Sequence, residues 1–140
     1  MKKFIFIILF IPMFLFASHV SYEVKIYHVI FSSLFPQKDL INVWSDSAKK
    51  KETLSQIKCI HFVELQKNAD ILLLSKTKNL TSDTMKFVTS YKLLKHYKQS
   101  AVGGFYWQKG RPNILFLKKN LQKYHLKLPP SLQEYEVDSL

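Results

Sequence analysis

The side chains that could do chemistry are spread along the chain in no catalytic pattern. Ser, His and Asp are all present, but no nucleophile elbow, phosphate-binding glycine loop or glycosidase acid–base pair accompanies them. Five histidines are scattered without the spacing of a metal site: His19, His28, His61, His96 and His125. We therefore predict a protein that is not an enzyme and that holds no metal and no cofactor.

The densest group of recognition residues lies in residues 103–113. Two glycines allow a strand to approach its neighbour closely, and three consecutive aromatic residues follow them. Because side chains alternate along a strand, one aromatic ring must face away from the other two. One interpretation is a stable hairpin with a cross-strand aromatic cluster. The other is a protein-docking edge, whose partner-binding residues would be Phe105, Trp107, Lys109 and Arg111.

A second candidate is the polar loop that follows the apolar run 71–74. Loops after buried strands of α/β domains hold ligands, and hydroxyl and ammonium groups suit a small anion. The ligand-binding residues would be Ser75, Lys76, Thr77 and Lys78. The alternative interpretation is a solvated connection.

Cys59 is the single cysteine, so no internal disulfide is available. We expect a small buried apolar residue, with a free thiol or an intermolecular bond as the sharper alternative. Its spacing of two from His61 places both on one face of a strand, but two ligands do not make a metal site.

Apolar periodicity and turn residues predict the elements that must position these groups. Helices are expected at residues 20–35, 48–57, 90–97 and 118–128, and strands at 40–44, 60–63, 71–74, 86–89, 101–107 and 113–117. Residues 85–97 could instead form one continuous helix. The last two strands form a hairpin, and the tail 131–140 is expected to be partly loose. The pattern predicts a single three-layer α/β domain with a mixed β-sheet, a C-terminal hairpin and a closing helix.

The N-terminal segment predicts the compartment. Lys2 and Lys3 precede an uncharged apolar run, residues 4–15, and small residues begin at Ala17. This is the pattern of a secretory signal peptide, and the run is shorter than a membrane-spanning helix. We predict a signal peptide at residues 1–17 and a periplasmic domain at 18–140, with an uncleaved N-terminal anchor as the alternative.

The charge limits the classes of partner. The formal net charge is +11, and Arg111 is the only arginine among 21 basic residues. Proteins that read nucleic acids favour arginine, so we predict no nucleic-acid partner. The charge is compatible with contact to an anionic membrane surface or to an acidic protein, and also with a lysine surface that is simply solvated.

Three segments resemble the YfiR/HmsC-like family of small periplasmic regulatory proteins: the alanine–aspartate–apolar run 69–75, the Gly103–Gly104 entry into a hairpin, and the closing segment 112–121. The resemblance covers nearly all of the chain after the signal peptide. It implies an α/β sandwich that tends to dimerise and a regulator rather than a catalyst. The best-known member represses an inner-membrane diguanylate cyclase through its periplasmic domain, and so controls cyclic di-GMP.

The chain departs from that member in two ways. It is shorter between Trp44 and Ile60, and it lacks the cysteine pairs that sense redox state there. We expect a periplasmic, non-catalytic regulator that binds an inner-membrane signalling protein, as a monomer or a homodimer, without the redox control. The alternative is a small solute-binding domain for an anion, of the kind found in periplasmic binding proteins.

Overall fold

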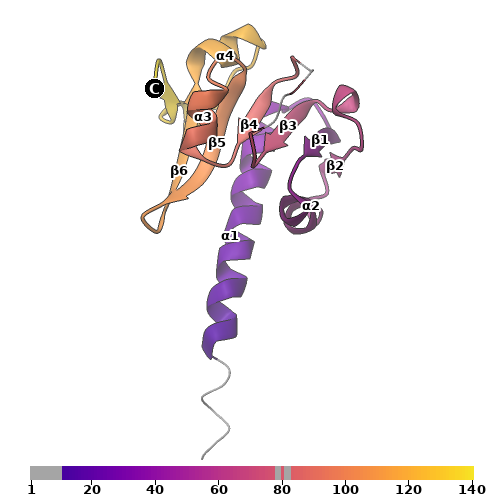
Figure 1. The fold of residues 1–140 in the computed structure, drawn as a ribbon, viewed down its shortest axis with the longest axis vertical. Coiled ribbons are helices and arrows are strands. Elements are labelled where there is room, and N and C mark those ends of the chain that lie inside the picture. Colours follow the sequence, from indigo (N-terminus) through magenta and orange to yellow (C-terminus); the bar gives the residue numbers. More distant parts are fainter. Residues whose placement is uncertain (1–10, 78–79, 81–82) are drawn as a thin grey trace, which may run out of the picture.

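A computed structural model describes the backbone of residues 11–77, 80 and 83–140, and the side chains from Tyr22 onward apart from those gaps. Its centre is a seven-stranded mixed sheet in the order β2-β1-β3-β4-β5-β6-β7 (Figure 1). The strands are β1 Ile41–Ser45, β2 Ile60–Phe62, β3 Ile71–Leu74, β4 Lys86–Val88, β5 Ala101–Gln108, β6 Arg111–Leu117 and β7 Glu136–Val137. Neighbours from β2 to β5 are parallel, β5 and β6 are antiparallel, and β6 and β7 are parallel.

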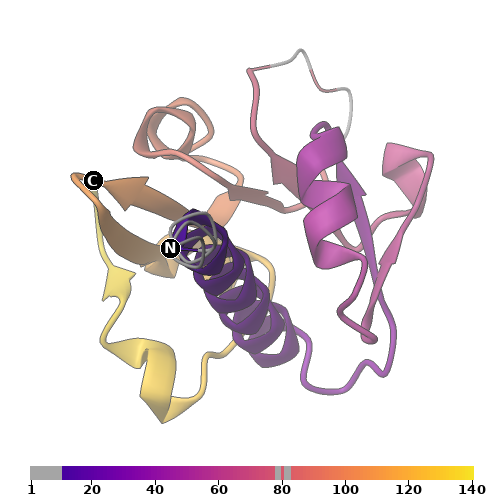
Figure 2. The same cartoon turned by 90° about the horizontal axis from the view of Figure 1, so that it is seen from below.

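Helices cover both faces of this sheet. They are α1 Ile11–Leu34, α2 Ala48–Leu54, α3 Tyr91–His96, α4 Lys118–Lys123 and α5 Pro130–Gln133, with a 3-10 turn, η1, at Gln66–Asn68. Figure 2 shows α1 on one side of the sheet and α3 on the other. The domain is therefore a single three-layer α/β domain, as the sequence predicts.

The central strand β3 shows why two layers of helices are needed. All four of its side chains are fully buried. Ile71 and Leu73 join the core beneath α1, while Leu72 and Leu74 join the core beneath α3. A continuous apolar run in a parallel sheet requires cover on both faces.

Several element boundaries differ from the sequence prediction for local reasons. Ser90 accepts a hydrogen bond from the amide of Leu93 at 3.2 Å and caps α3, so the single helix 85–97 is wrong. The closing helix ends at Lys123, because His125 adopts a positive φ of 58°. The tail contains two short elements that the sequence did not predict, α5 and β7, and the Phe116 amide donates to the Tyr135 carbonyl at 2.9 Å.

Gly103 shows why the β5–β6 hairpin begins with a glycine pair. A Cβ atom at this position would lie 2.4 Å from the Leu115 carbonyl oxygen and 2.9 Å from a Phe116 ring carbon. Gly104 is less crowded, with 3.0 Å to a Val88 methyl group. The glycines therefore permit β5 to approach β4 and β6 closely.

The N-terminal helix extends beyond the sheet on the side where the hairpin ends (Figure 1). Residues 1–10 of the predicted signal peptide lie outside the described residues. In the part of the chain that the structure describes, no helix has both the length and the apolar character needed to cross a membrane.

Candidate functional site

The parallel strands β1, β3 and β4 end side by side at one edge of the sheet, which we call the carboxyl edge. The order β2-β1-β3-β4-β5 reverses direction between β1 and β3. In open α/β sheets, ligands bind outside the carboxyl ends of the strands at such a reversal. The carboxyl edge beside β1 and β3 is therefore where a ligand site is expected.

Asp46, which follows β1, bonds to the loop after β3. Its carboxylate accepts hydrogen bonds from the backbone amides of Ser75 at 2.7 Å and Lys76 at 2.9 Å. An anion could bind these two amides only by displacing the Asp46 carboxylate. The protein's own carboxylate already occupies that position, which weighs against the small-anion hypothesis.

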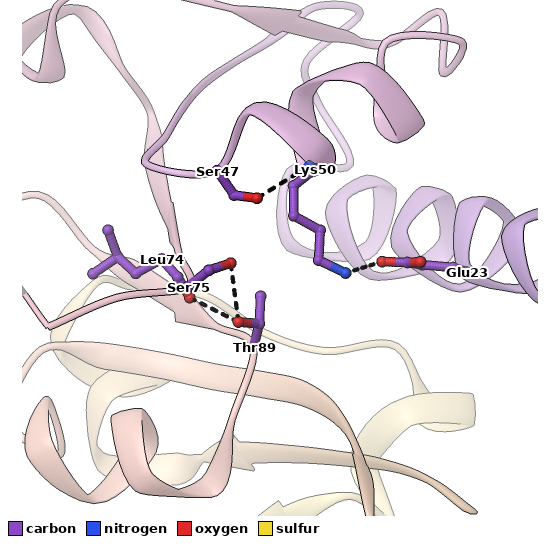
Figure 3. A network of polar contacts seen from close by, with 6 residues as sticks. All are labelled: Glu23, Ser47, Lys50, Leu74, Ser75 and Thr89. Atoms are coloured by element: carbon purple, nitrogen blue, oxygen red, sulfur yellow. Dashed lines mark hydrogen bonds and ion pairs between the residues drawn. The ribbon is translucent and has the colours of Figure 1, made fainter. Parts of the chain in front are cut away.

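The neighbouring hydroxyl groups also have partners within the protein (Figure 3). The Thr89 hydroxyl lies 3.1 Å from that of Ser75 and 3.2 Å from the Leu74 carbonyl oxygen. Ser47 accepts from the Lys50 amide at 3.2 Å and so caps α2. We call Asp46, Ser47, Ser75 and Thr89, with the residues they bond, the carboxyl-edge network.

An ion pair closes the network on the side of α1. The Lys50 ammonium contacts the Glu23 carboxylate and lies 5.5 Å from the centre of the Tyr27 ring. The Tyr27 hydroxyl is fully buried and has no hydrogen-bond partner among the described residues. Burial, and then the charge of Glu23, raise the pKa of Tyr27 far above its usual range, so it stays neutral.

The predicted ligand-binding loop is only partly available. Ser75 is half-buried, Lys76 and Thr77 are exposed, and Lys78 lies outside the described residues. The structure therefore brings together Ser75 and Thr89, a pair that the sequence prediction did not contain, rather than a row of loop side chains.

The second candidate site is the end of the β5–β6 hairpin. Trp107 is 42% exposed and its ring lies 6.0 Å from that of Tyr22 on α1. Lys109 and Arg111 are exposed on either side of Gly110. We call Trp107, Lys109 and Arg111 the hairpin tip.

The other two aromatic residues of β5 are not at the surface. Phe105 is 3% exposed and packs against Tyr27, with ring centres 5.4 Å apart. It is a core residue. The prediction that Phe105 contacts a partner is therefore wrong, because its side chain is buried. Tyr106 faces the opposite side and approaches Tyr91 of α3, 6.1 Å between ring centres.

The turn of the hairpin is short. Gln108 pairs with Arg111, which leaves only Lys109 and Gly110 in the loop. Both have positive φ, 51° and 74°, as in a type I′ turn. Lysine is an unusual residue in this conformation, which asparagine or glycine adopts at lower cost.

Among the described residues, no three His, Cys, Asp or Glu side chains are grouped so that they could hold a metal ion. Cys59 is a half-buried free thiol, 3.9 Å from the Ser32 hydroxyl, rather than the fully buried residue expected. His61 is exposed.

The aspartate of the segment 69–75 has a structural role. The Asp70 carboxylate accepts from the Asn42 amide at 2.9 Å and from the Lys38 ammonium at 2.9 Å. It joins the start of β3 to β1. This part of the resemblance is therefore explained by the sheet, whatever the function.

Comparison with protein-family models and with curated proteins found no match for the chain.

Proposed function

We propose that this protein is an exported, non-catalytic regulator that binds the periplasmic domain of an inner-membrane signalling protein, in the manner of the YfiR family. The observation that carries the proposal is the hairpin tip. It presents an exposed tryptophan and an arginine, the residue types that contribute most to protein–protein binding.

The base of the hairpin makes the tip suitable for recognition. Phe105 anchors β5 in the core through Tyr27, and six residue pairs join β5 to β6. A rigid strand pair holds its terminal side chains in place before binding, so little conformational entropy is lost on contact. Trp107 also rests on Tyr22 and Phe105, which limits its rotamers.

The carboxyl-edge network supports a binding role over a catalytic or solute-binding one. Its hydroxyl and carboxylate groups bond to one another and to backbone amides. A catalytic site instead needs a nucleophile and a base directed at a substrate position. A diguanylate cyclase or a related sensor is the class of partner that the family resemblance favours.

The test is a cross-linking pull-down of the exported protein from solubilised membranes, with partners identified by mass spectrometry. We expect recovery of a membrane protein that has a periplasmic domain and a cytoplasmic cyclase or kinase domain. Trp107→Ala and Arg111→Glu should each abolish this recovery while the melting temperature changes little.

The matched controls lie away from the hairpin tip. Leu65 is 52% exposed and follows β2, the edge strand on the other side of the sheet from β6 and β7. Lys98 is exposed near α4. Leu65→Ala and Lys98→Glu should leave recovery intact. Equal recovery with the hairpin-tip variants and the controls would contradict the proposal.

A further inference from the structure

Exposed aromatic and basic side chains gather on the side of the molecule where the parallel strands end. Three large aromatic residues there are about two-fifths exposed: Tyr22 at 41%, Tyr91 at 40% and Trp107 at 42%. Exposed basic residues stand among them: Lys25, Lys109 and Arg111. We call these six residues the carboxyl-edge face.

The topology explains why residues from distant parts of the chain share this face. α1 leads into the start of β1, so its N-terminal part lies at the carboxyl edge. α3 begins there because it follows β4, and the hairpin extends past the same edge (Figure 1). The contact of 6.0 Å between the Tyr22 and Trp107 rings confirms that α1 and the hairpin meet there.

The exposed charge of this face is positive. Two further exposed lysines, Lys49 and Lys76, begin α2 and follow β3. The nearby acids are engaged: Glu23 pairs with Lys50, and Asp46 accepts two backbone amides. Glu52, one turn further along α2, is an exposed carboxylate near these lysines in the sequence.

We infer that the carboxyl-edge face rests on the surface of an anionic lipid bilayer. Tryptophan and tyrosine favour the headgroup level because their rings are apolar with a polar edge, and lysine and arginine bind the lipid phosphates. The three aromatic residues come from three elements, α1, α3 and β5, and so mark a broad surface rather than a pocket. Removal of the predicted signal peptide, residues 1–17, takes away the first part of α1, which projects past this face (Figure 1). A planar membrane then fits such a surface better than a compact acidic peptide.

The inference rests on the proposed function only in placing the protein beside a membrane; the lipid contact itself needs no protein partner. In this inference the hairpin tip contacts lipid as well as the protein partner, and it binds that partner at the level of the lipid headgroups. Lipid binding and partner binding can be measured separately.

The experiment uses protein isolated after export and two kinds of vesicle, phosphatidylcholine alone and phosphatidylcholine with phosphatidylglycerol. We expect co-sedimentation with the anionic vesicles only, weakening as salt is added. In a Trp44→Phe background, the fluorescence of Trp107 should shift to shorter wavelength on binding. Lys109→Gln with Arg111→Gln should lower the partition coefficient by about fivefold for each charge lost.

The matched control removes two charges at the opposite edge. Lys98 and Lys119 are exposed and line a cavity of about 400 Å³ beside α4, far from the hairpin tip (Figure 1). Lys98→Gln with Lys119→Gln changes the net charge equally and should leave vesicle binding within twofold of the parent protein.

Two results would overturn the lipid inference. One is no binding to the anionic vesicles by a folded protein. The other is equal weakening by both charge pairs, which would indicate attraction by bulk charge alone. If vesicle binding fails while the membrane-protein partner is still recovered in detergent, only the lipid inference falls. If vesicles bind and no partner is recovered, the proposed function falls instead.

Discussion

The carboxyl-edge network and the hairpin tip lie on the same side of the molecule. The polar groups of the network bond within the protein, whereas those of the hairpin tip face solvent. In the network, Asp46 satisfies two loop amides, and Ser75 meets Thr89. At the hairpin tip, Lys109 and Arg111 stand in solvent beside an exposed indole. The first region is built to hold strands together, whereas the second is available to another surface.

This contrast bears on the usual rule for α/β sheets. The reversal of strand order beside β1 is where ligands are expected, yet here the Asp46 carboxylate accepts two amides of the loop after β3. The residues with recognition chemistry instead lie on an antiparallel extension of the sheet. Position in the fold and chemistry of the site therefore point to different places, and the chemistry should decide.

The largest expected effect on stability comes from a substitution at the base of the hairpin rather than at its tip. Gly103→Ala places a Cβ atom 2.4 Å from the Leu115 carbonyl oxygen, so β5 and β6 must move apart. We expect a loss of about 3 kcal/mol in the free energy of unfolding, measured by urea denaturation.

Gly110→Ala is the control for this substitution at the tip. No atom of the described residues lies within 4 Å of a Cβ at Gly110, its chain neighbours aside, so the positive φ of 74° is what opposes the change. The expected cost is about 1 kcal/mol. Equal losses at the two glycines would contradict the close packing assigned to Gly103.

The next effect concerns the network. Asp46→Ala leaves the amides of Ser75 and Lys76 without their acceptor, and charge-assisted bonds are the stronger kind. We expect about 2 kcal/mol of destabilisation in thermal or urea unfolding, with partner recovery unchanged in the folded protein. Loss of partner recovery without loss of stability would place the functional site at the network.

Trp107→Ala should show the reverse behaviour. The indole is 42% exposed, so truncation should lower the free energy of unfolding by about 1 kcal/mol or less. Binding to the partner should weaken by about 2 kcal/mol or more, as for central aromatic residues of interfaces. Titration calorimetry with the isolated periplasmic domain of the partner provides the measurement. A change in stability larger than the change in binding would assign Trp107 to the fold alone.

A smaller effect of opposite sign is expected beneath the network. Tyr27→Phe removes a buried hydroxyl for which the described part of the chain offers no hydrogen-bond partner, and it keeps the ring contacts with Phe31 and Phe105. The free energy of unfolding should rise by about 1 kcal/mol, because the hydroxyl no longer has to be desolvated. A clear loss of stability in urea denaturation would mean that this hydroxyl has a partner after all.

The sequence predicted what depends on local pattern. The apolar run of β3, the helix after Ser90 and the glycine-led hairpin each carry their signal within a few residues. The helix at the N-terminus was predicted from its apolar stripe, although its described backbone begins earlier, at Ile11. Periodicity therefore predicted whether a segment is a helix or a strand, but it did not predict the residues at which the element begins and ends.

What the sequence did not predict depends on which strands become neighbours. The bonds of Asp46 to the loop after β3 are one example, because they require β1 and β3 to pair. The pairing of Lys50 with Glu23 spans two helices. Strand alternation predicted that one of three aromatic residues would face away, but not that Phe105 would lie beneath α1.

The smallest expected effect improves the hairpin tip. Lys109 has a φ of 51° in a turn with two central residues of positive φ, where asparagine followed by glycine is preferred. Lys109→Asn should therefore raise the free energy of unfolding by about 0.5 kcal/mol, since asparagine reaches this conformation at lower cost. The same substitution removes a charge from the carboxyl-edge face, so binding to anionic vesicles should fall while stability rises. Lys109→Gln is the control, because it removes the charge without the turn preference. A more stable protein that binds vesicles as tightly as the parent would show that lysine is kept at this strained position for some reason other than its charge.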